Sequence, residues 1–232
     1  MISPPSAGEP EISPADGTSS DGSGAICDTE ADLSDDALRL MELRHRTKNI
    51  LAIVQALVNQ TLRGEVTIDE ARQALTDRLV AMGNAVDLLI GKAWEPTELK
   101  SVLACALTHA VKFGERVKVS GPEVHLGSGA AMTLSLALHE LESNAIKYGA
   151  LSDDVGSVHI EWSISPADAK NWLQLEWREE NGPPVLRPNR SGFGTKLISS
   201  VTGRRLGGAA ECQFQPEGFR WILLASAEGL AS

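Results

Sequence analysis

The stretch LSLALHELESNAIKYGAL, residues 134–151, has the pattern of one long helix that carries several polar side chains. Glu140 and Asn144 are four residues apart and Lys147 follows three residues later, so these side chains share one helix face. Such a row suits a magnesium–triphosphate site, because carboxylate and amide oxygens can hold the metal while an ammonium group reaches phosphate. A solvated polar face is the alternative interpretation of this helix taken alone.

Two later segments favour the nucleotide interpretation. WREENGPPV, residues 177–185, reads as a strand end that breaks into a Gly-Pro loop beside two carboxylates. RSGFGTKL, residues 190–197, places Gly192 and Gly194 before a helix that begins near Thr195. Glycine-rich helix openings present backbone N–H groups to phosphate, so this segment is predicted to form a phosphate lid.

Three regions are predicted along the chain: an acidic tail or linker over residues 1–33, a helical hairpin over 34–93 and a mixed domain over 94–232 that carries the candidate nucleotide site. The first region is rich in Ser, Pro, Gly and Asp and cannot bury enough apolar surface to offset its chain entropy. It is therefore expected to be disordered, either as a tail or as a link to another domain.

The hairpin is predicted from apolar residues that recur at alternating spacings of three and four over residues 40–61 and again over 68–89. Thr67 and Glu70 form a capping box at the start of the second helix, and Gly91 ends it. Two antiparallel helices with one apolar stripe each cannot form a stable core alone. Dimerisation into a four-helix bundle is therefore predicted.

Helices and strands mix in the remainder of the chain. Thr97 is predicted to cap a helix that runs to about Ala110. Strands are expected at residues 116–120, 158–164, 172–179, 209–215 and 218–225. This pattern predicts an α+β sandwich with helices on one face of a sheet.

Composition narrows the class of protein. A net charge of −10 over 232 residues argues against a nucleic acid or an anionic membrane as the main partner. No apolar run approaches the ~18 residues of a membrane-spanning helix, and the N-terminus lacks a signal-peptide pattern. The 3 cysteines are far apart with no metal-ligand spacing, which indicates reduced thiols. A soluble cytoplasmic protein is therefore expected.

In the order HELESNAIKYGALS, WREENGP and GFGTKLI, the chain resembles the ATP-binding domain of sensor histidine kinases, a fold shared with type II topoisomerase and chaperone ATPases. More narrowly it is similar to the HWE subfamily, named for a histidine beside the asparagine box and a Trp-x-Glu motif. Those residues are His139, Trp177 and Glu179 here. The resemblance extends over about residues 38–225 and implies a helical hairpin followed by an α/β sandwich of the histidine kinase/gyrase-type ATPase fold.

This resemblance implies ATP and Mg²⁺ as cofactors, with Asn144 coordinating magnesium and Glu140 assisting the metal or acting as a catalytic base. A carboxylate would accept the adenine amino hydrogen. Glu179 fits the Trp-x-Glu motif and Glu180 fits the spacing of other histidine kinases, so both stay open. The second glycine of that box is Pro184 here, which the subfamily often shows. The implied ATP-binding residues are Asn144, Lys147, Tyr148, Trp177, Glu179, Gly182, Gly192, Phe193, Gly194 and Thr195.

Phosphoryl transfer to histidine needs a neutral imidazole that is free to approach the γ-phosphate in line. His139 lies within the rigid nucleotide-binding helix and is expected to have a structural or orienting role. His45 lies in ELRHRTKNILAIVQAL, about 200° around the helix from the seam residues on either side. Its HRxKN motif resembles the phosphoacceptor helix of these kinases. Arg46 and Lys48 would disfavour protonation of its imidazole, and Asn49 either positions a dephosphorylating water or is an ordinary exposed residue.

The predicted activity is that of an ATP-dependent protein-histidine kinase, which autophosphorylates His45 and relays the phosphoryl group to an aspartate of a response regulator receiver domain in two-component signalling. A homodimer is expected, although Thr47 and Thr61 weaken the apolar seam. One alternative is a non-catalytic phosphotransfer or scaffold protein that retains the fold, which intact Asn144 and Lys147 disfavour. The other is a plain ATPase, disfavoured by the basic helix around His45 and the missing transducer domain.

Overall fold

The structure, a computed structural model, describes residues 41, 44, 47, 48, 50–59, 61, 67–91, 95–167, 170–185 and 193–232. Two compact units make up the chain, Met1–Ala52 and Ile53–Ser232. The described positions of the first unit are helical, and Lys48 among them is exposed. The predicted site residues His45, Arg46, Asn49 and Gly192 lie outside the described residues.

Helix α2 (Ile68–Gly91) begins and ends where the sequence predicts. Thr67 N–H donates to Glu70 Oε2 at 2.9 Å and Glu70 N–H donates to Thr67 Oγ1 at 3.3 Å, which is the expected capping box. Its predicted apolar stripe is only partly buried, since Ile68 is 86% and Leu79 is 40% exposed. The residues that the structure does bury on α2 are Ala71, Ala81, Met82, Ala85 and Leu89.

A five-stranded sheet with the order β2-β4-β5-β7-β6 forms the centre of the second unit. Its strands are β2 (Val117–Ser120), β4 (Ser157–Ala167), β5 (Lys170–Glu180), β6 (Ala209–Gln215) and β7 (Gly218–Ser226). β2 pairs with β4 in parallel, and the other pairs are antiparallel. All of the strands that the sequence predicts are present in this sheet.

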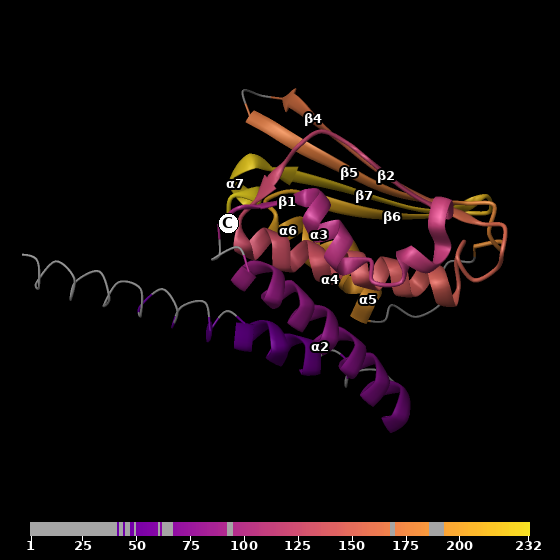
Figure 1. The fold of residues 1–232 in the computed structure, drawn as a ribbon, viewed down its shortest axis with the longest axis horizontal. Coiled ribbons are helices and arrows are strands. Elements are labelled where there is room, and N and C mark those ends of the chain that lie inside the picture. Colours follow the sequence, from indigo (N-terminus) through magenta and orange to yellow (C-terminus); the bar gives the residue numbers. More distant parts are fainter. Residues whose placement is uncertain are drawn as a thin grey trace, which may run out of the picture. The chain divides into compact units, whose positions relative to one another are not determined.

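Helices cover one side of the sheet (Figure 1). They are α3 (Leu99–Ala106), α4 (Ser128–Lys147), α5 (Phe193–Lys196) and α6 (Thr202–Arg205), with the π-helical turn η2 (Leu197–Val201) between the last two. A 3₁₀ segment, η1 (Ala110–Arg116), leads into β2, and α7 (Ala227–Leu230) follows β7. The predicted α+β sandwich is confirmed. No helix within these described ranges is long and apolar enough to cross a membrane.

The predicted helix cap at Thr97 is wrong. The chain pairs there instead, because β1 (Thr97–Glu98) and β3 (His125–Leu126) form a two-stranded antiparallel sheet. The Thr97 hydroxyl donates to the carbonyl oxygen of Glu95 at 3.3 Å, so it is directed away from the helix. α3 starts without a side-chain cap and ends before the predicted Ala110.

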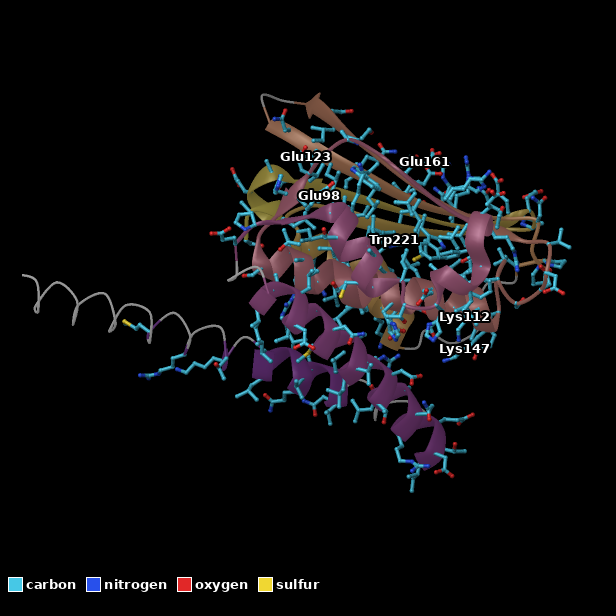
Figure 2. The ribbon with its side chains drawn as sticks, in the orientation of Figure 1. Glu98, Lys112, Glu123, Lys147, Glu161 and Trp221 are labelled. Carbon is cyan, nitrogen blue, oxygen red and sulfur yellow. The ribbon has the colours of Figure 1, made fainter. Side chains whose placement is uncertain are left out.

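The alternating faces of β5 place the candidate residues Trp177 and Glu179 on the buried side of the strand. Leu173, Leu175, Trp177 and Glu179 are buried on one face, whereas the residues between them are half-buried or exposed. Trp221 of β7 pairs with Trp177 and is fully buried; its indole N–H donates to Ile198 O at 2.7 Å (Figure 2). Glu179 is therefore the carboxylate that β5 directs into the apolar layer between sheet and helices.

Candidate functional site

The Glu179 carboxylate lies at the junction between the end of β5 and the end of α4. It is 4% exposed. Its Oε2 accepts the backbone N–H of Ala150 at 2.8 Å, and its Oε1 accepts the indole N–H of Trp177 at 3.1 Å. Glu180, the next residue, points to the other face of the sheet and pairs with Arg178 at 3.0 Å. Trp177 thus orients Glu179 from within the core.

Glycines allow this junction to close. A Cβ atom added at Gly149 would collide with Glu179 Oε2, and one added at Gly182 would stand 2.5 Å from the Cα of Ala150. Asn181, between Glu180 and Gly182, has a positive φ of 57°, a conformation that asparagine tolerates better than most residues. The turn after β5 therefore packs its backbone directly against the chain that leaves α4.

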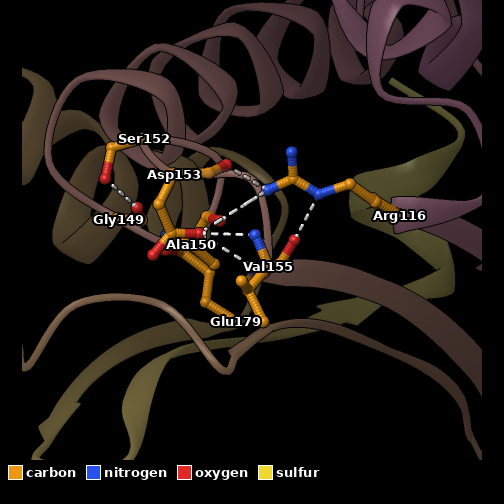
Figure 3. A network of polar contacts seen from close by, with 8 residues as sticks. Arg116, Gly149, Ala150, Ser152, Asp153, Val155 and Glu179 are labelled. Carbon is orange, nitrogen blue, oxygen red and sulfur yellow. Dashed lines mark hydrogen bonds and ion pairs between the residues drawn. The ribbon is translucent and has the colours of Figure 1, made fainter.

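Arg116 holds the loop that carries the Ala150 N–H (Figure 3). Its Nε donates to Gly156 O at 2.6 Å, and its Nη2 donates to Ala150 O at 3.1 Å and to Asp153 O at 2.6 Å. The Asp153 carboxylate accepts the N–H groups of Gly156 and Val155, which lower its pKa. One guanidinium group thus joins the start of β2 to the loop that follows α4.

Burial raises the pKa of Glu179 above its ordinary value of 4.5, although the Ala150 and Trp177 donors oppose the shift. The folded state therefore binds the proton more tightly than the unfolded chain does. The contribution of Glu179 to stability is greatest below pH 4.5 and decreases as the pH rises through the folded pKa. Above that pKa the cost of the buried charge is constant.

We expect the difference in unfolding free energy between the wild type and Glu179→Gln to decrease as the pH rises from 4.5, and then to level off. Glutamine cannot titrate, so the difference isolates this carboxyl group from the other acids. Urea unfolding at a series of pH values measures it. A difference that is independent of pH would contradict the raised pKa.

The helix α4 carries the second group of candidate residues. Glu140 is 7% exposed and Asn144 is half-buried on the same helix face. Lys147 and Tyr148 are exposed at the C-terminal end of the helix, where Lys147 lies on the side away from the sheet (Figure 2). No group of three or more His, Cys, Asp or Glu side chains in the described part of the chain could hold a metal. The carboxylate and amide oxygens of Glu140 and Asn144 nevertheless fit Mg²⁺, which takes few protein ligands and keeps several waters.

Glu140 is engaged by an arginine of α2. Arg78 Nε lies 2.5 Å from Glu140 Oε1, and Arg78 Nη2 lies 3.2 Å from Oε2. The side chains of Arg78 and Glu140 are only 12% and 10% exposed. The glycine segment reaches the same carboxylate, because a Cβ atom at Gly194 would collide with Glu140 Oε2. Thr195, next to it in α5, is half-buried.

A cavity of about 480 Å³ lies between α2, α4 and the chain that follows α3. His139 lines it, and its buried Nδ1 has no hydrogen-bond partner within the described ranges. Burial lowers the pKa of His139, although nearby Glu140 and Glu142 oppose the shift. Glu142 accepts the backbone N–H of His109 at 2.9 Å and pairs with its imidazole at 3.2 Å. His139 is thus half-buried on α4, at the wall of this cavity.

A family model described as HWE histidine kinase matches residues 42–123. A blue-light-activated histidine kinase of Brucella anthropi is 37% identical over 193 residues, which are 83% of this chain and 39% of that protein. The chain belongs to the HWE histidine kinase family. A protein of the same description from Brucella ovis is 35% identical over 82% of the chain and 39% of its own length. The chain thus spans about two fifths of the length of these curated relatives.

Solved structures show the same fold. The histidine kinase domain of the Erythrobacter litoralis EL346 blue-light-activated histidine kinase superposes with a TM-score of 0.53 at 12% identity, covering 81% of this chain and 96% of that one. The EL346 kinase itself gives 0.56 at 19% identity over 83% and 59% of the two chains. A helical hairpin followed by the α/β sandwich of histidine kinase ATPase domains is therefore the fold of this HWE kinase chain.

Sequence reasoning did not identify Arg78, Glu142 or Arg116. The sequence did contain a sign of Arg78. It lies seven residues after Ala71 and four before Met82, so it falls on the buried stripe of α2. An arginine in an apolar stripe indicates a buried partner. Arg116 bonds to backbone carbonyls that lie far along the chain, and such a contact leaves no pattern in the sequence.

Proposed function

We propose that this HWE kinase chain binds Mg-ATP in the domain over residues 94–232 and transfers the γ-phosphoryl group to His45 of the hairpin over residues 34–93. An aspartate of a response regulator receiver domain then accepts the phosphoryl group. The cytoplasm, where ATP is available, is the proposed compartment. The observation that carries the proposal is the buried Glu179 carboxylate, held by two N–H donors at the junction of β5 and α4.

Glu179 rather than Glu180 is proposed to accept the adenine amino hydrogen. Its side chain is on the face of β5 that α4 covers, whereas Glu180 is on the opposite face with a side-chain exposure of 41%. Trp177 is proposed to support Glu179 instead of contacting nucleotide, because it is 1% exposed and its indole N–H is bonded to that carboxylate. Gly182 is proposed to let the turn after β5 pass close to the loop that donates to Glu179, because a Cβ atom there would stand 2.5 Å from the Cα of Ala150.

The phosphate end of the site is proposed to lie along the polar row of α4. Asn144 and Glu140 supply oxygens for Mg²⁺, which, when bound, neutralises charge on the phosphate oxygens. Lys147 and Tyr148 reach the nucleotide from the end of the helix. The lid residues proposed to cover the phosphates are Gly192, Phe193, Gly194 and Thr195.

Transfer itself is proposed to follow an in-line course. A neutral imidazole nitrogen of His45 bonds to the γ-phosphorus while the bond to the ADP oxygen breaks, and the imidazole proton passes to a base, for which Glu140 is the candidate. Arg46 and Lys48 attract the phosphates and disfavour protonation of the imidazole. Asn49 is the proposed water-positioning residue.

Dimerisation through the hairpin is part of the proposal. Ile68, Leu79 and Ile90 remain 86%, 40% and 57% exposed along α2, and a second hairpin would cover them in a four-helix bundle. Neither nucleic acid nor a membrane surface is among the proposed partners, in agreement with the net charge of −10.

Asn144→Ala is expected to reduce both Mg-ATP affinity and phosphorylation by about 100-fold, because even residues that only hydrogen-bond to a metal's ligands contribute about 10- to 100-fold to metal affinity or activity. Incubation with γ-labelled ATP should give an acid-labile, alkali-stable phosphoprotein in the wild type. The matched control is Asn171→Ala, an exposed asparagine of β5. A wild type that binds no Mg-ATP would refute the kinase proposal and favour the scaffold alternative.

A further inference from the structure

The arginine at position 78 joins three helical segments. On α2 it lies among the residues that pack toward α4, and the two helices run alongside each other (Figure 1). Besides its two contacts with Glu140, Arg78 Nη1 donates to Thr61 Oγ1 at 2.9 Å. Thr61 is 7% exposed and its hydroxyl donates to Leu57 O at 2.7 Å. The polar residue that interrupts the apolar seam of the first helix is thus an anchor for Arg78.

Stability alone is a poor reason for this arrangement. Removing a guanidinium and a carboxylate from water is costly, and apolar side chains of similar size often stabilise a core at least as well as a buried ion pair. The pair does, however, make α2 sensitive to the charge state and ligands of Glu140. A fork of two N–H donors on two carboxylate oxygens also has a defined geometry, which fixes the rotamer of Glu140.

The same geometry conflicts with a metal-binding role for Glu140. Both carboxylate oxygens face the Arg78 guanidinium, and Gly194 of the lid segment lies against one of them. A dication placed at these oxygens would be repelled by the arginine at contact distance. The Glu140 carboxylate can therefore pair with Arg78 or bind magnesium nucleotide, but it cannot make both sets of contacts at once.

We propose that Arg78 is a positioning residue of the hairpin that competes with magnesium nucleotide for Glu140. This inference rests on the proposed function, because it takes the role of Glu140 from there. While the pair is formed, α2 holds the carboxylate out of reach of the metal. Nucleotide binding separates the pair and frees α2 from the nucleotide-binding helix. By linkage, an input that breaks the Arg78–Glu140 pair strengthens nucleotide binding by the same factor by which nucleotide binding favours the broken pair.

The test is nucleotide affinity with and without magnesium for Arg78→Gln. We expect Mg-ATP to bind about tenfold more tightly to the variant, within the usual range of coupling between sites. Affinity for ATP in EDTA should be unchanged, because only the metal competes with the arginine. Arg72→Gln is the matched control, since Arg72 lies on the same helix and pairs with Asp69 on the exposed surface. Unchanged or weaker Mg-ATP binding by Arg78→Gln would overturn the proposal.

Two further variants keep the result interpretable. Arg78→Lys retains the charge but loses the two-donor fork, so it should tighten Mg-ATP binding by less than Arg78→Gln does, and it covers the case in which the glutamine variant does not fold. Thr61→Val removes the anchor alone and should tighten Mg-ATP binding by a smaller factor. If the wild type binds Mg-ATP but these variants do not bind it more tightly, only the role of Arg78 fails. If the wild type binds no Mg-ATP, the proposed function fails as well.

A nucleotide-free measurement tests the ion pair itself. Unfolding midpoints of Arg78→Gln, Glu140→Gln and the double variant form a double-mutant cycle. We expect the double variant to lose less than the sum of the two single shifts. Additive shifts would mean that the pair does not form in solution, which would overturn the proposal.

Discussion

Replacing His45 with alanine is expected to reduce phosphorylation of the chain by labelled ATP by about 100-fold or more. The imidazole nitrogen is the proposed nucleophile, and alanine offers no atom that can form the new bond to phosphorus. Binding of Mg-ATP should be retained, because the proposed nucleotide residues lie in the other domain. Autophosphorylation followed by site mapping with mass spectrometry measures the first effect, and nucleotide titration measures the second.

A second histidine serves as the control for this experiment. His125 is 55% exposed at β3 and is not among the proposed site residues, so His125→Ala should be phosphorylated like the wild type. His139 is a stricter control than His125, because it lies on the helix that carries the proposed nucleotide residues and lines the cavity between α2 and α4. Label that persists in His45→Ala would assign the phosphoacceptor to another residue.

Glu179→Ala is expected to lower both stability and the preference for adenine. The N–H groups of Ala150 and Trp177 would lose their buried acceptor, which costs about 1–3 kcal/mol for each donor. Relief of the buried charge offsets part of this cost, so we expect a loss of about 2–4 kcal/mol in unfolding free energy. The preference for ATP over GTP should fall by at least about tenfold, because guanine has a carbonyl oxygen at C6, where adenine has the amino group whose hydrogen the carboxylate accepts.

Glu180→Ala is the matched control for this prediction. Its carboxylate is 41% exposed on the opposite face of the sheet, where pairing with Arg178 contributes only about 0–1 kcal/mol. Its nucleotide preference should equal that of the wild type. Should Glu179→Ala unfold, Glu179→Gln preserves the side-chain volume and still lacks a full carboxylate. Loss of adenine preference in Glu180→Ala alone would transfer the role to that residue.

Much of the fold could be predicted because its signals are local. The capping box of α2 depends on residues three apart, and the strands show the period of two that one buried face imposes. The helix cap predicted at Thr97 is wrong for the opposite reason. Its preference for a helix cap was overridden by pairing with residues of β3, a contact that is distant in the chain.

The candidate site divides in the same way. The row of Glu140 and Asn144 follows from helical spacing alone, so the sequence predicted it. The choice between Glu179 and Glu180 did not follow, because both motif spacings fit and adjacent strand residues point to opposite faces. Only the packing of β5 against α4 shows which carboxylate enters the helical layer.

By itself, the sequence determined the order of hairpin and sandwich, the strand set, the helix that carries Asn144 and membership of the HWE kinases, since each depends on periodicity or on short motifs. Tertiary structure decided that Glu179 is the buried carboxylate and that Arg78 occupies Glu140. These contacts join residues 29 and 62 positions apart. No repeating pattern in the sequence signals contacts at these separations. The contacts are determined by which faces the folded elements bury against each other.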